Sequence, residues 1–253
     1  MKPSFYGPIR ARGYDIGTDV SEIMTFYVEH WKRLGKPEPI IEPMCGTGLN
    51  MVWFLREGAE CDGLDASPYM LDICRQRLSD EGFHSNLYEQ NLEDMALPRN
   101  YKFMFLPGGS FGHVYDKSIA TESLRRMRAQ LQPGGWLVLD ARQPPYMSHF
   151  GKDGEVDHDL DDHEDGVTIF VTGYWQHMEG GRVIRKWNKY EKYANDVLVK
   201  TEIFDYRERL FEETEMRNMM ERAGFTDIQT MKAYEYDSAA NESDGIVFTC
   251  RKT

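Results

Sequence analysis

The segment Glu42-Pro43-Met44-Cys45-Gly46-Thr47-Gly48 places a carboxylate and two glycines at the end of an apolar run. Glycines in such a loop let the backbone approach a ligand closely, at the point where doubly wound sheets bind their cofactors. A dinucleotide fingerprint, G-x-G-x-x-G, needs a third glycine, but Met51 occupies that position. The Glu42 carboxylate would also repel a pyrophosphate. The loop therefore favours a cationic ligand over a dinucleotide.

A second carboxylate, Asp65, closes the segment Gly63-Leu64-Asp65. At the end of a second strand, a carboxylate can accept hydrogen bonds from both hydroxyls of a ribose. Asp65 alone does not separate NAD from S-adenosylmethionine. Together with the missing third glycine and with Glu42, it favours S-adenosylmethionine.

Strands and helices alternate along the first part of the chain. The predicted strands are 39–42, 60–64, 85–90, 101–106 and 136–140, and the predicted helices are 19–34, 49–56, 67–78 and 120–131. Ser67-Pro68 supplies an N-cap followed by proline at the first helical position. Strands that are apolar throughout, with helices between them, indicate a doubly wound parallel sheet that is covered on both faces.

After Asp140 the pattern changes. Residues 142–165 read as irregular and end in an acidic run over 157–165, and three β-rich stretches follow at 167–176, 182–193 and 197–210. A last helix over 216–223 and two closing strands, 226–236 and 245–251, complete the chain. We therefore predict an α/β fold: a doubly wound, mostly parallel, seven-stranded Rossmann-like sheet with a small antiparallel β insert between the fifth strand and the last helix. The cofactor domain would comprise 1–141 and 211–253, with an N-terminal arm over 1–18, and the insert would comprise 142–210.

The motifs resemble those of a known family. Glu42-Pro43 to Gly48 and Gly63-Leu64-Asp65-Ala66-Ser67-Pro68 look like motifs I and II of class I S-adenosylmethionine-dependent methyltransferases, in their small-molecule branch. The resemblance covers about residues 14–141 and 212–251 and includes the Leu131-Gln132-Pro133-Gly134-Gly135-Trp136 turn. It implies an enzyme that transfers a methyl group by SN2 displacement to a nitrogen or oxygen of a small molecule, with S-adenosylhomocysteine as product.

The resemblance also implies which residues bind the cofactor. Glu42 would reach the ammonium group and Asp65 the ribose. The remaining implied contacts are Gly46, Thr47 and Gly48 at the methionine moiety, Ala66, Met70, Asn91 and Leu92 around the adenine, and Leu106 and Pro107 beside the sulfonium.

On the acceptor side, His113 lies in a Ser-x-Gly-His stretch that similar enzymes carry after the fourth strand. It is the candidate base or orienting group, although a neutral amine acceptor needs no base. Tyr14 is the second catalytic candidate, in an arm that would fold over the cofactor carboxylate; the sequence leaves open which of Arg10, Arg12 and Tyr14 makes that contact. Five further aromatic side chains of the insert are candidates to line the acceptor pocket, although packing is the favoured interpretation: Tyr146, His149, Trp175, Trp187 and Tyr190.

Composition narrows the alternatives. A net charge of −12 opposes nucleic acid as a partner, and no apolar run approaches the ~20 residues that span a bilayer. With no signal-peptide pattern, a cytoplasmic protein is expected. The four scattered cysteines predict buried thiols rather than zinc or disulfides, and the acidic run predicts a solvated loop rather than a metal site.

Other functions remain possible at this stage. Gln143-Pro144-Pro145-Tyr146 resembles the N-P-P-Y signature of enzymes that methylate nucleobases or protein glutamine, but it follows the fifth strand instead of the fourth. A protein or RNA methyltransferase and a non-catalytic S-adenosylmethionine-binding protein are the alternatives, and a nicotinamide oxidoreductase is a more distant one. The acceptor, the choice between nitrogen and oxygen, and the oligomeric state, monomer or homodimer, are not fixed by the sequence.

Overall fold

The structure is a computed structural model that describes residues 6–163, 167–236, 238 and 245–253, and for 160–163 the backbone only. Its main sheet has seven strands in the order β10-β11-β5-β4-β1-β2-β3. The parallel strands are β1 (Ile40–Pro43), β2 (Cys61–Asp65), β3 (Leu87–Glu89), β4 (Tyr101–Leu106) and β5 (Leu131–Arg142). The antiparallel pair β10 (Thr226–Lys232) and β11 (Gly245–Arg251) joins β5 through β11.

Helices cover both faces of this sheet because the strands are apolar on both sides. In β4, Met104 and Leu106 pack with α5 (Lys117–Gln130) and α6 (Glu213–Ala223). Phe103 and Phe105 point the other way. They pack against the helices of the second face, which are α2 (Ser21–Arg33), α3 (Met51–Arg56) and α4 (Pro68–Asp80). The predicted doubly wound fold is confirmed.

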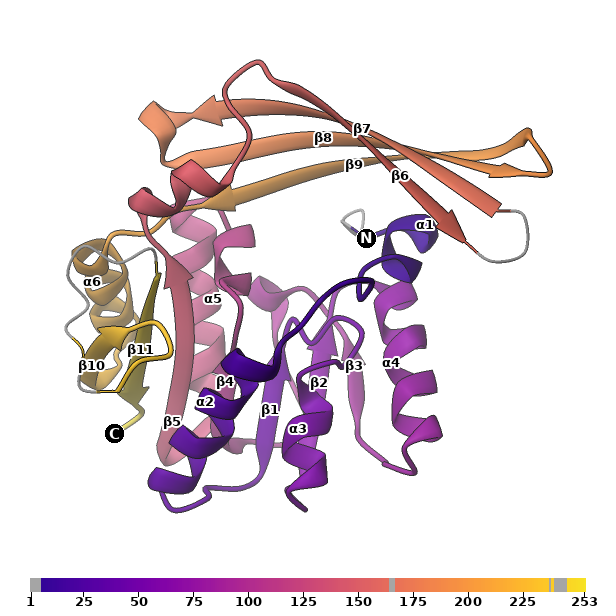
Figure 1. The fold of residues 1–253 in the computed structure, drawn as a ribbon. Coiled ribbons are helices and arrows are strands. Elements are labelled where there is room, and N and C mark those ends of the chain that lie inside the picture. Colours follow the sequence, from indigo (N-terminus) through magenta and orange to yellow (C-terminus); the bar gives the residue numbers. More distant parts are fainter. Residues whose placement is uncertain (1–5, 164–166, 237, 239–244) are drawn as a thin grey trace.

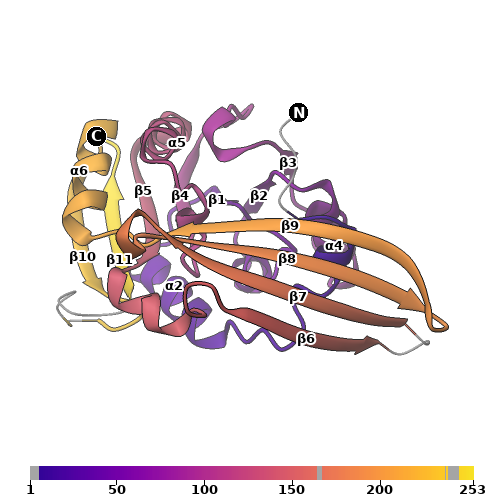
Figure 2. The ribbon, with the colours of Figure 1, turned by 90° about the horizontal axis from the view of Figure 1, so that it is seen from above.

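The insert is a separate antiparallel sheet of four strands in the order β6-β7-β8-β9. These strands are β6 (Val156–His163), β7 (Val167–Met178), β8 (Val183–Ala194) and β9 (Val197–Arg209). Figure 1 shows this sheet lying over the carboxyl ends of the parallel strands, and Figure 2 shows that it extends past α4. The insert therefore covers the edge where doubly wound sheets bind ligands.

The expectation of a solvated loop at the acidic run was wrong for its described part. Residues 157–163 belong to β6, which pairs antiparallel with β7 along its whole length. Asp157 forms an ion pair of 2.6 Å with Lys186 and accepts a hydrogen bond of 2.9 Å from the Trp175 indole. An edge strand tolerates such charge because one side of it faces water. Residues 164 and 165 of the run lie outside the described part.

Two other features of the fold differ from prediction. β5 begins at Leu131, so the Pro133-Gly134-Gly135 turn lies inside the strand. A short helix, α1 (Pro8–Arg12), lies in the N-terminal arm and was not predicted. The four cysteines are free and buried, as expected. Across the described ranges, no helix is long and apolar enough to cross a membrane.

Candidate functional site

The glycine loop after β1 takes the backbone conformation that its glycines permit. Gly46 and Gly48 have φ of +53° and +75°. A Cβ on Gly48 would lie 2.5 Å from the Cys74 sulfur of α4, so only glycine fits there. Thr47 is buried, and its hydroxyl donates a 2.8 Å hydrogen bond to Asp15 of the arm. The loop is thus fixed between α4 and the N-terminal arm.

Asp65 closes β2 and links the two predicted motifs. One carboxylate oxygen accepts the Gly46 N–H at 2.9 Å, and the other accepts the Ser67 N–H at 2.8 Å. Burial raises the pKa of Asp65. A carboxylate offers about four lone-pair directions, so each oxygen retains acceptor capacity beyond its backbone contact.

Glu42 at the end of β1 is 1% exposed. Its Oε1 accepts a 2.9 Å hydrogen bond from the Asn50 amide, whereas its Oε2 has no partner within the described structure. Burial raises the pKa of Glu42. An unsatisfied buried carboxylate oxygen is costly, and it is a feature that a cationic ligand would satisfy. Asn50 was not singled out from the sequence, because its contact with Glu42 depends on how the loop folds back.

A cavity of about 330 Å³ adjoins these elements. Its lining includes five predicted site residues: Asp65, Ala66, Asn91, Leu92 and His113. The other eight predicted site residues are not among the lining residues: Tyr14, Glu42, Gly46, Thr47, Gly48, Met70, Leu106 and Pro107. Met70 and Leu106 are fully buried, and the Leu106 carbonyl accepts a hydrogen bond from the Tyr27 hydroxyl at 3.1 Å. The cavity thus brings the predicted ribose and adenine positions and His113 to one space.

His113 ends a short 3₁₀ helix, η2 (Ser110–His113), that follows β4. Its Nδ1 lies 3.2 Å from the Arg207 carbonyl of β9. A carbonyl only accepts, so in the neutral ring Nδ1 carries the hydrogen and Nε2 carries the lone pair. Burial lowers the pKa of His113, with the Glu208 carboxylate opposing the shift. The ring is therefore neutral near pH 7 and can accept a proton.

The roof of the cavity comes from β9, which contributes Phe204, Tyr206 and Arg207. The Tyr206 ring meets His113 edge-on, with ring centres 5.0 Å apart. The Tyr206 hydroxyl donates to Glu208, which also forms a 2.6 Å ion pair with Arg142. Sequence reasoning missed these β9 residues. The alternation Phe204-x-Tyr206-x-Glu208 places these three side chains on one face of the strand, but it does not indicate what that face covers.

The aromatic residues that were candidates for the acceptor pocket do not line this cavity. Trp187 is 38% exposed and stacks on Tyr174, with ring centres 6.0 Å apart. Tyr190 packs with Ile9 and Phe204 in a small cluster under the insert. The other three are Tyr146, His149 and Trp175. The Tyr146 and His149 rings stack on each other in η3 (Pro144–His149). Gln143-Pro144-Pro145-Tyr146 thus lies apart from the cavity.

The N-terminal arm is held by both halves of the molecule. The Glu202 carboxylate of β9 accepts the N–H groups of Ile9 at 3.1 Å and Arg10 at 3.4 Å. On the other side, the Ser67 hydroxyl donates to the Tyr6 carbonyl at 2.7 Å. The Arg10 guanidinium lies 5.1 Å from the centre of the Tyr14 ring. Tyr6 lines the cavity, so this arm closes it from a third side.

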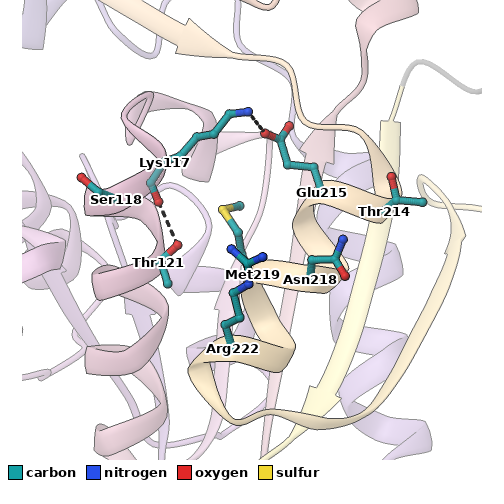
Figure 3. A pocket seen from close by; sticks show the side chains of 8 residues that line it. All are labelled: Lys117, Ser118, Thr121, Thr214, Glu215, Asn218, Met219 and Arg222. Carbon is teal, nitrogen blue, oxygen red and sulfur yellow. Dashed lines mark hydrogen bonds and ion pairs between the residues drawn. The ribbon is translucent and has the colours of Figure 1, made fainter.

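A second hollow, of about 520 Å³, lies between α5 and α6 (Figure 3). Lys117 and Glu215 form an ion pair across it, and Arg222 points into it. It contains no predicted site residue. Among the described side chains, no group of three or more His, Cys, Asp or Glu is placed to hold a metal ion.

Comparison with known proteins agrees with this arrangement. Residues 40–135 match the family model of a methyltransferase domain. The dTDP-3-amino-3,4,6-trideoxy-α-D-glucopyranose N,N-dimethyltransferase of Streptomyces venezuelae is 25% identical over 158 residues, which are 62% of each chain. A related dTDP-amino-sugar N,N-dimethyltransferase of Streptomyces fradiae is 23% identical over 52% of this chain and 49% of its own length. The matches thus span 62% and 49% of the lengths of these two relatives.

Solved structures share the fold over nearly the whole chain. An S-adenosylmethionine-dependent methyltransferase from Clostridium acetobutylicum superposes with a TM-score of 0.76 at 13% identity, covering 96% of both chains. A sugar N-methyltransferase from Streptoalloteichus sp. gives a TM-score of 0.74 at 19% identity, covering 100% of this chain and 97% of the other. The matched segment, the fold and the motif positions agree: residues 40–135 match a methyltransferase domain, and the whole chain has the fold of S-adenosylmethionine-dependent methyltransferases.

Proposed function

We propose that this protein transfers a methyl group from S-adenosylmethionine to an amino nitrogen of a small, sugar-like acceptor. The observation that carries the proposal is the 330 Å³ cavity, in which Asp65 and Asn91 line the cofactor side and the neutral His113 lines the same space. The named activities of the two Streptomyces relatives support an amine on a sugar as the acceptor.

The residues present fit the cofactor. The unpartnered Glu42 Oε2 suits the ammonium group, and Asp65 suits the ribose hydroxyls. Glu42 is buried and Asp65 is half-buried, and a cation beside Glu42 would favour its ionised form. We propose three further groups of cofactor contacts. Gly46, Thr47 and Gly48 would contact the methionine moiety, and Leu106 and Pro107 would lie near the sulfonium. Around the adenine we place Ala66, Met70, Asn91 and Leu92. When bound, S-adenosylmethionine supplies an electrophilic methyl group on that sulfonium.

Within the arm, Arg10 is our choice for the cofactor carboxylate. Its guanidinium makes no hydrogen bond or ion pair with any described residue and lies over the Tyr6 and Tyr14 rings. Arg12 is exposed. A half-buried guanidinium without an anion is unusual, because Arg is the residue best suited to bidentate carboxylate recognition.

On the acceptor side, His113 would take the proton that an amine loses on methylation. The amine lone pair forms the new C–N bond as the S–C bond breaks, and the resulting ammonium passes one proton to Nε2 of His113. Burial raises the pKa of Tyr14, so its hydroxyl stays protonated. We therefore assign Tyr14 no role as a base, and propose that its ring helps to place the Arg10 guanidinium, which lies 5.1 Å from the ring centre, at the cofactor carboxylate.

The insert, 142–210, would act as the acceptor-side cap of the cofactor domain. Its strand β9 roofs the cavity with Phe204 and Tyr206. A roofed space of this size suits a small acceptor better than a polypeptide or an RNA, which need an open groove.

Glu202→Ala is expected to weaken the binding of S-adenosylhomocysteine about 10-fold, because the carboxylate fixes the first turn of α1 and thereby the arm. Hydrogen bonds to a charged acceptor contribute about 1.5 kcal/mol or more each, and about 1.4 kcal/mol is tenfold in affinity. Isothermal titration calorimetry measures the change. Thr201→Ala, at the adjacent exposed position of β9, is the matched control. Equal affinities of the two variants would show that the arm takes no part in cofactor binding.

Two measurements test the proposed function. Calorimetric titration with S-adenosylmethionine, S-adenosylhomocysteine and NAD should show micromolar binding of the two sulfur compounds only. Transfer of radiolabelled methyl to dTDP-3-amino-3,4,6-trideoxyglucose and to simpler amino sugars should then show turnover. Binding of NAD alone would overturn the cofactor assignment. Binding of S-adenosylmethionine with transfer to hydroxyl compounds alone would replace nitrogen by oxygen as the acceptor atom.

A further inference from the structure

We propose that Asp140, at the carboxyl end of β5, is a positioning residue for the methyl transfer, because it fixes the turn that delivers His113 to the cavity. This inference rests on the proposed function, but its structural part can be tested separately. Neither the sequence motifs nor the cofactor contacts account for this carboxylate.

Asp140 is 4% exposed and is surrounded by hydrogen-bond donors. Its Oδ1 accepts the Tyr27 hydroxyl at 2.7 Å and the Gly108 N–H at 2.9 Å. Its Oδ2 accepts the Gly109 N–H at 2.6 Å. The carboxylate thus ties α2 and the turn after β4 to the neighbouring strand β5.

The turn after β4 depends on two consecutive glycines, Gly108 and Gly109. Gly108 and Gly109 have φ of +71° and +72°, a conformation that glycine adopts without strain. A Cβ on Gly109 would lie 3.0 Å from the Arg142 side chain. Two consecutive left-handed residues turn both N–H groups toward one point, and Asp140 occupies that point. An amide at this position would direct an N–H at one of these donors.

The turn leads directly into the helix that ends at His113. Gly109 is the residue before η2, and the Gly109 carbonyl accepts the Gly112 N–H at 2.9 Å. Gly112 in turn packs against β9, where a Cβ would lie 2.8 Å from the Glu208 side chain. With one end of η2 fixed by Asp140 and the other by the contact of His113 with the Arg207 carbonyl, the imidazole has a defined orientation.

Asp62 provides a matched control. It is 2% exposed, accepts a backbone N–H from Asn86 at 3.0 Å, and accepts the Tyr101 hydroxyl at 2.8 Å. Both acids are thus nearly buried and accept from a tyrosine hydroxyl and from backbone N–H, and Asp62 in addition accepts the Asn86 side-chain amide at 3.1 Å and pairs with Arg99 at 3.4 Å. Neither acid lines the cavity, but the hydrogen bonds of Asp62 go to Asn86 and Tyr101, whereas those of Asp140 hold the turn after β4.

The experiment compares Asp140→Asn with Asp62→Asn by hydrogen–deuterium exchange of the 107–113 segment and by methyl-transfer kinetics with dTDP-3-amino-3,4,6-trideoxyglucose. We expect Asp140→Asn to speed exchange of this segment at least 10-fold and to lower kcat at least 100-fold. The Kd for S-adenosylhomocysteine should stay within threefold of wild type. Asp62→Asn should change neither the exchange of this segment nor kcat by more than threefold.

Unchanged exchange of 107–113 in Asp140→Asn would overturn the proposal, and so would a kcat equal to that of Asp62→Asn. If Asp140→Asn does not fold, the same exchange measurement is made on Tyr27→Phe. This variant removes the hydroxyl that donates to Asp140 and keeps the aromatic ring. At least threefold faster exchange of the segment then supports the proposal, and unchanged exchange overturns it. If wild type binds S-adenosylhomocysteine but methylates no amine, the proposed function fails while the exchange result still decides the role of Asp140 in the turn.

Discussion

Asp65→Ala is expected to weaken S-adenosylmethionine binding by about 100-fold or more. The two ribose hydroxyls would each donate to this carboxylate, and a hydrogen bond to a charged group contributes about 1.5–3 kcal/mol. Each ~1.4 kcal/mol corresponds to tenfold in affinity. The Gly46 and Ser67 N–H groups would also lose their acceptor, which loosens the loop that surrounds the methionine moiety. Both effects act in the same direction, so this change has the largest expected effect on binding.

Calorimetric titration with S-adenosylhomocysteine measures this loss. Asp65→Asn separates the two effects, because the amide keeps one oxygen acceptor for a backbone N–H but loses the charge. Asp72→Ala is the control on α4: its carboxylate is exposed and, among the described residues, pairs only with Arg75, at 2.6 Å. A Kd for Asp65→Ala within threefold of that for Asp72→Ala would exclude Asp65 from the cofactor site.

The places of Gly46, Gly48 and Asp65 in the fold could be predicted from sequence because their determinants are local. Gly46, Gly48 and Asp65 lie at the ends of two consecutive strands, and apolar runs and turn residues mark those ends. Parallel strands bring their carboxyl ends to one edge of the sheet, so the register between β1 and β2 follows from the fold class. The N-cap at Ser67 is also local, and its hydroxyl accepts the Met70 N–H at 3.3 Å as predicted.

The acceptor side could not be predicted, because its determinants are distant along the chain. Helix α1 is only five residues long, and its first turn is held by Glu202, 193 residues from Ile9. Phe204 and Tyr206 line the cavity only because the insert folds back over the main sheet. No local pattern distinguishes such residues from ordinary packing in a β-sheet.

The acidic run over 157–165 is a second place where, in its described part, the sequence alone indicated the wrong local structure. Its charge density favours a loop when residues are considered alone. In the structure, its residues 157–163 pair with β7 along one side, and Lys186 partly neutralises Asp157. Tertiary context therefore overrode a low intrinsic β-propensity.

His113→Gln is expected to lower kcat by about 100-fold or more, since a positioned general base contributes about 10²–10⁴-fold. The Kd for S-adenosylmethionine should change less than threefold, because the proposed role of His113 is on the acceptor. His149→Gln is the control: its ring stacks on Tyr146, outside the cavity. Steady-state kinetics with an amino-sugar acceptor and calorimetry with the cofactor give the two quantities.

The pH profile identifies His113 more specifically than the rate alone. Burial disfavours the charged imidazolium and lowers the pKa of His113 below its ordinary value of about 6.5. The ring is thus neutral above this lowered pKa and becomes protonated as the pH falls through it. In wild type, kcat/KM should therefore fall on the acid side, below about pH 6.5. His113→Gln should lose this acid limb but keep any limb that belongs to the acceptor amine, because the amine titrates independently of the protein. An unchanged acid limb in the variant, with kcat within threefold of wild type, would assign the proton transfer to solvent or to another group.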